Sequence, residues 1–172
     1  GIIGMGYVGL PLVLRFCEEG FRVFGFDVDS KKVAQLKRGR SYLKSIPPSR
    51  ISQFVRNGLL DVTVDFSRLA KPDCIIICVP TPLTEKMEPD LRYIEKTTEA
   101  IRDHLRKGQI IILESTSYPG TTEELILPQL ESTGLKVGKD FFLAYSPERE
   151  DPGSKRFTTS QIQNVVSGVT PS

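Results

Sequence analysis

The sequence of 172 residues contains no tryptophan, one histidine and three cysteines. Cys17, Cys74 and Cys78 are odd in number and unevenly spaced, so they form neither a disulfide framework nor a CxxC pair. We expect all three to be buried apolar residues rather than metal ligands. His104 lies near the expected end of a helix, where a surface position is usual. Enzymes built around a histidine base are therefore disfavoured.

Long hydrophobic runs and an excess of one charge are also absent. No stretch approaches the ~18 apolar residues of a membrane-spanning helix, and no segment resembles a signal peptide. The 23 basic and 21 acidic residues are dispersed, so no nucleic-acid partner is predicted. The apolar and charged fractions, 39% and 26%, are those of an ordinary soluble protein. We expect one cytoplasmic domain without a membrane partner.

A glycine-rich turn stands near the beginning of the chain. Ile2 and Ile3 are predicted to end a buried strand, and Gly4-x-Gly6-x-x-Gly9 leads into a helical pattern. In a dinucleotide-binding turn the first glycine permits the tight turn, the second lets a pyrophosphate approach the backbone, and the third lets helix and strand pack closely. The N–H groups at the helix start would face the phosphates. The same pattern alone can be only a glycine-rich turn, so its meaning depends on the rest of the chain.

Asp27 follows the second apolar strand, at about the 20-residue distance that separates the glycine turn of a dinucleotide fold from its ribose-binding carboxylate. A carboxylate there repels a 2′-phosphate, which favours NAD over NADP. Asp29 competes for this role, but Asp29 or Ser30 is better interpreted as the cap of the next helix. Lys32 could reach the adenosine end of the cofactor or could be a solvated surface lysine.

The remaining pattern predicts helices that alternate with strands. Helices are expected over residues 10–19, from Asp29 or Ser30 to Gly39, from a Ser49 cap to Gly58, from an Asp90 cap to Gly108, and over 120–131, where Pro128 ends or kinks the helix. Strands are expected over residues 21–26, 60–64, 74–79, 109–113 and 140–144, and the run 163–169 could add a last one. This alternation predicts an α/β fold with a doubly wound, Rossmann-like, mostly parallel sheet and helices on both faces.

Polar loops follow several of the expected strands, at the edge where ligands bind in this architecture. Pro80 and Pro82 hold Thr81 in an extended loop, and Thr81 could offer a hydroxyl to the cofactor or only shape the turn. The loop 114–122 is rich in hydroxyl groups, and the loop 145–153 carries several charges.

Taken in order, these segments resemble the nucleotide-sugar 6-dehydrogenases, which oxidise UDP-glucose, GDP-mannose and UDP-N-acetylhexosamines with NAD. The similarity extends over the entire chain and rests on the blocks Gly4-x-Gly6-Tyr7-Val8-Gly9-Leu10-Pro11, Asp27 through Lys32, Val79-Pro80-Thr81-Pro82, Glu114-Ser115-Thr116, Ser146-Pro147-Glu148-Arg149 and Val165-Val166-Ser167-Gly168-Val169. The segment 145–153 is more similar to the UDP-N-acetylhexosamine branch than to the UDP-glucose branch, where an Asn-Pro-Glu segment is usual.

The resemblance implies a reaction and a set of roles. Family members oxidise C6 of the sugar from alcohol to carboxylate with two NAD molecules, through a thiohemiacetal on a cysteine that a lysine and an asparagine support. Their products serve polysaccharide biosynthesis, and the enzymes are homodimers or larger. Thr116 matches the threonine that positions the catalytic water, and Glu148 matches the active-site glutamate. The implied cofactor contacts are Gly4, Gly6, Tyr7, Val8, Gly9, Asp27, Lys32, Pro80, Thr81 and Thr116.

This sequence also departs from the family. The family cysteine lies in a glycine-rich segment beyond the present chain, and none of the three cysteines occupies its place. The lysine, the central dimer helix and the nucleotide-binding domain are absent too, and Pro152 stands where the UDP-glucose branch has a second glutamate. We therefore expect residues 1–172 to be one NAD-binding domain, inactive alone, in which 153–172 leads toward the central helix. The short first strand suggests that residues are missing in front.

Two other interpretations stay open. The chain could be a non-catalytic dinucleotide-binding or regulatory module with a vestigial site. It could also be the cofactor domain of a β-hydroxyacid dehydrogenase, a family that shares the glycine-rich start but lacks the Ser-Pro-Glu-Arg segment.

Overall fold

The computed structural model describes residues 1–85, 87–147 and 165–170. Within these ranges the chain forms a seven-stranded sheet in the order β3-β2-β1-β4-β5-β6-β7. The strands are β1 (Ile2–Ile3), β2 (Val23–Phe26), β3 (Leu60–Thr63), β4 (Cys74–Ile77), β5 (Ile110–Leu113), β6 (Phe142–Tyr145) and β7 (Ser167–Gly168). All pairs are parallel except β6 with β7. The first six strands have the order of a doubly wound dinucleotide fold, which confirms the predicted fold class.

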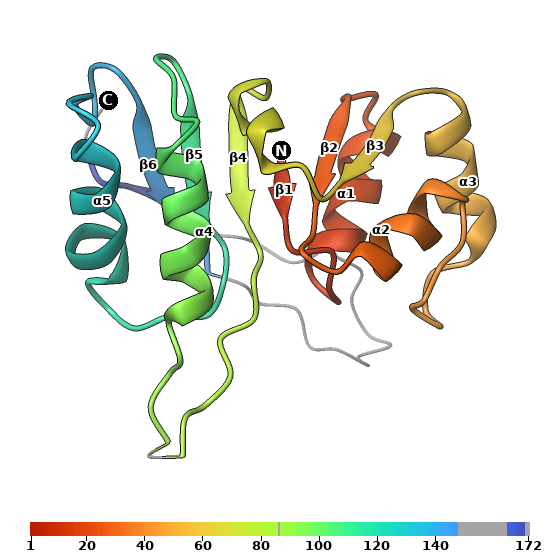
Figure 1. The fold of residues 1–172 in the computed structure, drawn as a ribbon, viewed down its shortest axis with the longest axis horizontal. Helices are drawn as coiled ribbons and strands as arrows, with labels where there is room; N and C mark the ends of the chain where they lie inside the picture. Colours follow the sequence, from red (N-terminus) through yellow and green to blue (C-terminus); the bar gives the residue numbers. More distant parts are fainter. Residues whose placement is uncertain (86, 148–164, 171–172) are drawn as a thin grey trace.

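The central strands of the sheet are buried on both faces because neighbouring side chains along them enter different cores. Ile2 packs in the core beneath the first three helices, whereas Ile3 packs in the other core with Ile75 and Ile77. A strand covered on both sides needs an unbroken apolar run, which is what β4 and β5 have. Figure 1 shows the two halves, with α2 and α3 beside β2 and β3, and α4 and α5 beside β5 and β6.

The helices largely follow the predicted positions. They are α1 (Gly9–Glu18), α2 (Ser30–Lys37), α3 (Pro48–Arg56), α4 (Arg92–Arg102) and α5 (Leu127–Glu131), with a 3₁₀ helix η1 (Phe66–Ala70) and a π-helix η2 (Thr121–Ile126). Asp29 caps α2 through the N–H groups of Lys31 and Lys32, as expected. Across the described ranges, every helix is too short or too polar to cross a membrane.

The predicted starts of two helices were wrong. Ser49 does not cap α3, because Pro47 occupies the N-cap and Pro48 the first turn. Proline suits that position, since its fixed φ is already helical and its missing N–H would have no intrahelical partner. Asp90 lies one residue before the N-cap of α4, although its carboxylate accepts the N–H of Arg92 at 3.1 Å.

The predicted end of one helix also differs from the structure. The helix from residue 92 ends at Arg102 rather than near Gly108. After Arg102, the segment that contains Arg106 and Gln109 is held by a cluster of polar contacts rather than by helical hydrogen bonds. The expected helix over 120–131 is present and ends at Glu131, but it is π-helical over Thr121–Ile126 and α-helical from Leu127, and Pro128 lies just after this change.

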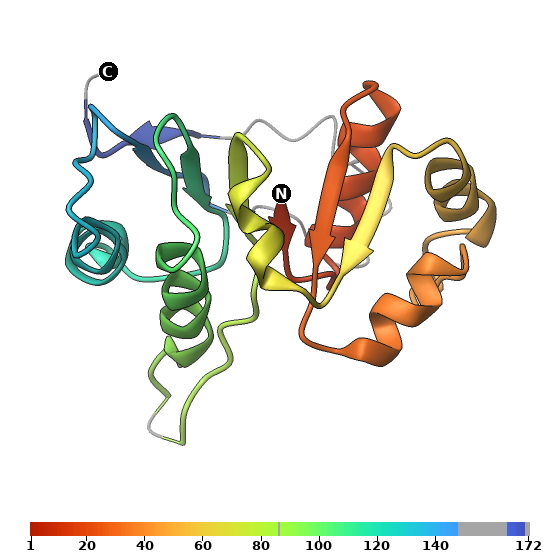
Figure 2. The ribbon, with the colours of Figure 1, turned by 45° about the horizontal axis from the view of Figure 1, so that its top comes forward.

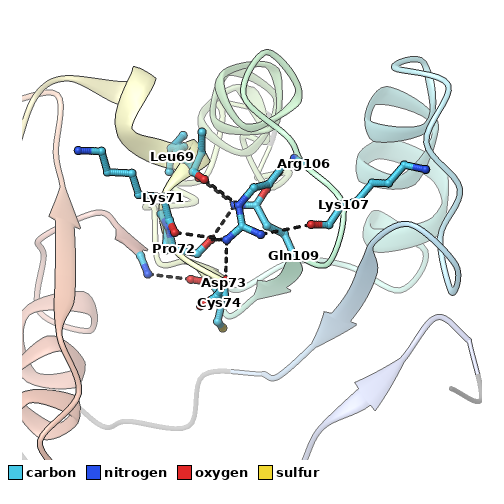
Figure 3. Close-up of polar contacts among 10 residues, drawn as sticks. Leu69, Lys71, Pro72, Asp73, Cys74, Arg106, Lys107 and Gln109 are labelled. Atoms are coloured by element: carbon cyan, nitrogen blue, oxygen red, sulfur yellow. Dashed lines mark hydrogen bonds and ion pairs between the residues drawn. The ribbon is translucent and has the colours of Figure 1, made fainter.

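Gln109 is the centre of this polar cluster, which lies beside the amino ends of β4 and β5 (Figure 3). Its amide nitrogen donates to the carbonyls of Leu69 and Pro72, and its amide oxygen accepts the N–H of Arg106 at 2.9 Å. The Arg106 guanidinium donates to the carbonyls of Ala70, Lys71, Pro72 and Lys107 and to the carboxylate of Asp73. The cluster therefore satisfies the carbonyls at the end of η1 and ties this helix to β5.

The connection from β4 to α4 extends away from the sheet, as Figures 1 and 2 both show. Leu83 and Pro89 pair as an isolated antiparallel bridge, so the segment is a narrow loop. Its origin at the carboxyl end of β4 places Pro80 and Thr81 beside the end of β1, where the strand order reverses.

Candidate cofactor cleft

A cleft of about 800 Å³ lies at the carboxyl ends of the central strands. It occupies the switch point between β1 and β4, where open α/β sheets bind their ligands. Its volume is in the range of small-molecule and cofactor sites. Residues from loops after four strands, and from η1 and α4, line it: Ile3, Gly4, Gly6, Tyr7, Val8, Asp27, Val28, Asp29, Lys32, Phe66, Cys78, Val79, Pro80, Thr81, Tyr93, Lys96, Thr97, Ala100, Glu114, Ser115 and Thr116.

The three glycines of the turn have different surroundings. Gly4 has a φ of +98°, and a Cβ there would lie 2.5 Å from the carbonyl oxygen of Cys78. A Cβ at Gly6 would meet none of the described residues within 4 Å, although Gly6 lines the cleft, so its backbone can receive a ligand there. Gly9 does not line the cleft, and a Cβ there would lie 1.9 Å from the carbonyl oxygen of Gly4. Gly9 therefore allows the close packing of α1 on the turn, while its predicted cofactor contact stays a prediction.

The start of α1 points its backbone toward this cleft. Tyr7 and Val8 line the cleft, and Val8 is the N-cap of the helix. Among residues 1–85, 87–147 and 165–170, no side chain caps this helix start. The arrangement fits a phosphate group, which would take the place of the capping oxygen at the positive end of the helix.

Asp27 lies at the floor of the cleft with both carboxylate oxygens bound to backbone N–H groups. Oδ2 accepts from Met5 and Oδ1 accepts from Asp29, each at 2.9 Å. The side chain is only 8% exposed, so its orientation is fixed before any ligand arrives. A carboxylate has about four acceptor sites, which leaves capacity for two ribose hydroxyls. The geometry fits the predicted ribose contact.

Lys32 faces the cleft. Its place in the sequence allowed either a cofactor contact or a solvated surface lysine, and this position is compatible with the contact. Its Nζ lies 3.9 Å from Oδ2 of Asp27 and 5.8 Å from the centre of the Tyr42 ring. The side chain remains 40% exposed, so the ammonium group can still meet a ligand. Its position beside Asp27 is at the end of the cleft where an adenosine ribose is expected.

Pro80, Thr81 and Thr116 also line the cleft, from the loops that follow β4 and β5. Thr81 is half-buried and Thr116 is exposed. Glu148, the predicted active-site glutamate, lies outside the described residues. The structure therefore brings together nine of the ten predicted cofactor positions, all except Gly9, and leaves the role of each as a prediction.

Several lining residues were not identified from the sequence. Four of them come from one face of α4, at the helical spacing i, i+3, i+4 and i+7: Tyr93, Lys96, Thr97 and Ala100. This helical spacing is the signal from which the face could have been identified. Phe66 from η1 and Val28 after Asp27 complete this side of the cleft.

Cys78 and Glu114 meet inside the cleft, with Sγ and Oε2 3.7 Å apart. Cys74 and Cys78 pack toward the same core, as the strand period predicted, and Cys17 is buried in that core too. Burial raises the pKa of the Cys17 thiol to about 11, so it is a poor nucleophile. In the part of the chain that the structure describes, no three His, Cys, Asp or Glu side chains gather as a metal site requires. His104 does not line the cleft.

Comparison with known proteins gives consistent results. The model of the NAD-binding domain of the UDP-glucose/GDP-mannose dehydrogenase family matches residues 1–172. The UDP-N-acetyl-D-glucosamine 6-dehydrogenase of Pseudomonas aeruginosa is 40% identical over 171 residues, which are 99% of this chain and 40% of that protein. The UDP-N-acetyl-D-mannosamine dehydrogenase of Pyrococcus horikoshii is 36% identical over 98% of this chain and 40% of its own length.

Solved structures agree with these relatives. The UDP-D-ManNAc dehydrogenase of Pyrococcus horikoshii superposes with a TM-score of 0.87 at 35% identity, over 98% of this chain and 41% of that one. A ternary complex of GDP-mannose dehydrogenase from Pseudomonas aeruginosa superposes with a TM-score of 0.81 at 31% identity, over 86% of this chain and 35% of that one. The chain thus spans about 40% of the length of the curated relatives it matches.

Proposed function

Because this chain belongs to the UDP-glucose/GDP-mannose dehydrogenase family and corresponds to its NAD-binding domain, we propose that the cleft binds NAD through the glycine turn, Asp27 and Lys32. The single observation that supports this most is the position of Asp27, which is fixed by two backbone N–H groups at the floor of the cleft. The family match also favours this proposal over a β-hydroxyacid dehydrogenase domain.

The proposal assigns the two halves of the cofactor to the two sides of the cleft. The adenosine lies between Asp27 and the α4 face that carries Thr97 and Ala100, and the pyrophosphate lies on Gly6 and the start of α1. Amide shifts in NMR spectra of the chain test this placement. Addition of NAD should move the signals of Gly6, Lys32 and neighbouring residues, while shifts confined to the far edge of the sheet would contradict it.

The nicotinamide end is assigned to the loop after β5. Ser115 and Thr116 line that end of the cleft, and Thr116 is exposed, so its hydroxyl can orient a water molecule. A carboxylate can accept a proton from an alcohol or from water, which suits the proposed role of Glu148. When bound, NAD accepts hydride from the substrate carbon, whereas these side chains would position water and move protons.

For the parent protein we propose oxidation of C6 of a UDP-N-acetylhexosamine to the uronate. The names of the relatives and the segment Ser146-Pro147-Glu148-Arg149 support this substrate class over UDP-glucose. The nucleophilic cysteine of this reaction would come from outside the 172 residues, because none of Cys17, Cys74 and Cys78 occupies the place of the family cysteine. The chain alone should bind NAD without completing the oxidation. Assay of the parent protein with UDP-N-acetylglucosamine, UDP-N-acetylmannosamine and UDP-glucose tests the substrate.

We infer that the parent protein is a cytoplasmic homodimer or larger assembly that supplies uronates for polysaccharide biosynthesis. The three cysteines form no disulfide with one another, which suits a reducing compartment, and NAD and sugar nucleotides are metabolites of that compartment. The mass of the parent protein in solution tests the assembly, and a monomer would contradict it.

A further inference from the structure

Tyr42 reaches the glycine turn from a distant part of the chain. It lies in the segment between α2 and α3, and its hydroxyl donates a hydrogen bond to the carbonyl oxygen of Met5, 37 residues away. The N–H of Met5 donates to Oδ2 of Asp27 at 2.9 Å. Both polar groups of the Met5 backbone are therefore held by side chains from other elements.

The Met5 side chain adds a third restraint. It is fully buried, and its sulfur fills the space beside Gly25 on β2, where a Cβ would lie only 2.9 Å away. Met5 stands between Gly4 and Gly6, which both line the cleft. The orientation of Met5 thus sets the orientation of the peptides that face the cleft.

The surroundings of Tyr42 keep its hydroxyl a donor. Burial, followed by the nearby charges of Asp27 and Asp29, raises the pKa of this phenol well above its usual range. The hydroxyl consequently stays protonated throughout the physiological range. The ring of the same residue lies beside the ammonium group of Lys32, 5.8 Å from its centre, so one side chain contacts both the turn and a cleft lysine.

We propose that Tyr42 is a positioning residue of the cofactor site, whose hydroxyl holds the Met5 peptide and thereby keeps the glycine turn in the conformation that receives the pyrophosphate of NAD. The inference rests on the proposed function, since it assigns the pyrophosphate to this turn. Neither the family blocks nor the cleft-lining residues include Tyr42.

The physical reason lies in the two flanking glycines. Glycine has wide conformational freedom, so a peptide between Gly4 and Gly6 can rotate unless something holds it. A turn that samples other orientations must be ordered when NAD binds, and the fraction of competent molecules lowers the apparent affinity directly. A typical hydrogen bond makes a net contribution that corresponds to a change of about three- to tenfold.

The test uses Tyr42→Phe in the 172-residue chain, which removes the hydroxyl and keeps the ring beside Lys32. NAD, ADP and adenosine are titrated by calorimetry or NMR, and thermal unfolding is recorded for each variant. The matched control is Thr133→Val, which removes a hydroxyl bond to the carbonyl of Leu130 at the remote end of α5. We expect NAD and ADP to bind Tyr42→Phe about three- to tenfold more weakly, adenosine to change less than about twofold, and the control to bind all three normally.

Amide hydrogen exchange supplies a readout that does not depend on NAD. In the absence of ligand, the Met5 amide should exchange faster in Tyr42→Phe than in the wild type, while protection of the central strands stays unchanged. Unchanged exchange at Met5, unchanged NAD affinity, or an equal loss for adenosine and ADP would overturn the inference. Failure of the wild-type chain to bind NAD would instead overturn the proposed function, and exchange would still report whether Tyr42 holds the turn.

Discussion

Gly9 and Gly4 are in contact across the start of α1, so closely that a Cβ on Gly9 would lie 1.9 Å from the carbonyl oxygen of Gly4. Gly4 itself sits at a φ of +98° and is confined by the backbone of Cys78. Neither backbone can move aside without displacing a central strand. The packing of helix, turn and sheet at the switch point therefore depends on this pair.

Gly9→Ala should destabilise the fold, since its methyl group meets backbone rather than a flexible side chain. Overpacking of this kind costs about 1–3 kcal/mol. Gly6→Ala is the matched variant, because its methyl group meets no atom within 4 Å in the part of the chain that the structure describes. We expect unchanged or slightly higher stability for Gly6→Ala but a loss of NAD affinity of about tenfold or more, since charge-assisted bonds to phosphate are blocked.

Urea unfolding and NAD titration of both variants check this pair. We expect Gly9→Ala to lower the free energy of unfolding and Gly6→Ala to lower the affinity for NAD. Equal stability losses in the two variants would show that the turn is not open to a ligand at Gly6.

Asp27→Asn should weaken NAD binding and reduce the preference for NAD over NADP. The charge that bonds the ribose and repels a 2′-phosphate is lost, and hydrogen bonds to a charged group contribute about 1.5–3 kcal/mol. Stability should fall as well, because the amide nitrogen of Asn cannot accept one of the two backbone N–H groups that Asp27 now binds. Calorimetry with both dinucleotides measures the change.

Asp29→Asn is the control for this prediction, because asparagine caps a helix as well as aspartate does. It should retain both the stability of α2 and the preference for NAD. If Asp29→Asn lost the preference and Asp27→Asn kept it, the ribose assignment would belong to Asp29.

Gln109→Leu should cost about 2–4 kcal/mol in the free energy of unfolding. The substitution leaves the carbonyl of Leu69 and the N–H of Arg106 without their buried partner, and each unsatisfied group costs about 1–3 kcal/mol. Lys71→Gln, on a neighbouring exposed side chain, should change stability by less than about 0.5 kcal/mol. Denaturant titration measures both, and a loss below 1 kcal/mol for Gln109→Leu would show that water replaces its contacts.

Acid should remove a small stabilising contribution from the pair of Asp61 and Arg68. The hydrogen bond from the Arg68 guanidinium lowers the pKa of Asp61 in the folded chain. A depressed folded pKa contributes stability that is complete above the unfolded pKa of about 3.9 and is lost as the pH falls through the folded value. The side chains of Arg68 and Asp61 are 22% and 36% exposed, so we expect less than about 1 kcal/mol.

Urea unfolding of the wild type and Asp61→Asn at pH 7, 4 and 3 tests this contribution. The stability difference between the two proteins should shrink as the pH falls below 4. A difference that stays constant over this range would show that the pair makes no pH-dependent contribution.

The strands and the glycine turn could be predicted because their signals are local. An unbroken run such as Cys74–Ile77 predicts a strand buried on both faces, and Gly4, Gly6 and Gly9 are spaced as a phosphate-binding turn requires. The cap at Asp29 was predicted for the same reason, since a capping side chain acts on the residues next to it. Elements whose cause lies within a few residues are thus accessible from sequence.

Other features depend on contacts between distant residues. The position of Lys32 at the cleft and the bond from Tyr42 to Met5 exist only once the sheet has brought these segments together. The early end of α4 is followed by the polar cluster around Gln109, whose partners include carbonyls in and just after η1. The π-helical turn before Pro128 arises from backbone geometry that no residue type signals on its own.

Titration of NAD and NADP into the unmodified 172-residue chain tests the central claim most directly. The account predicts saturable binding of NAD and at least about tenfold weaker binding of NADP, because Asp27 bonds the ribose hydroxyls and repels a 2′-phosphate. Absence of NAD binding, or tighter binding of NADP than of NAD, would contradict it.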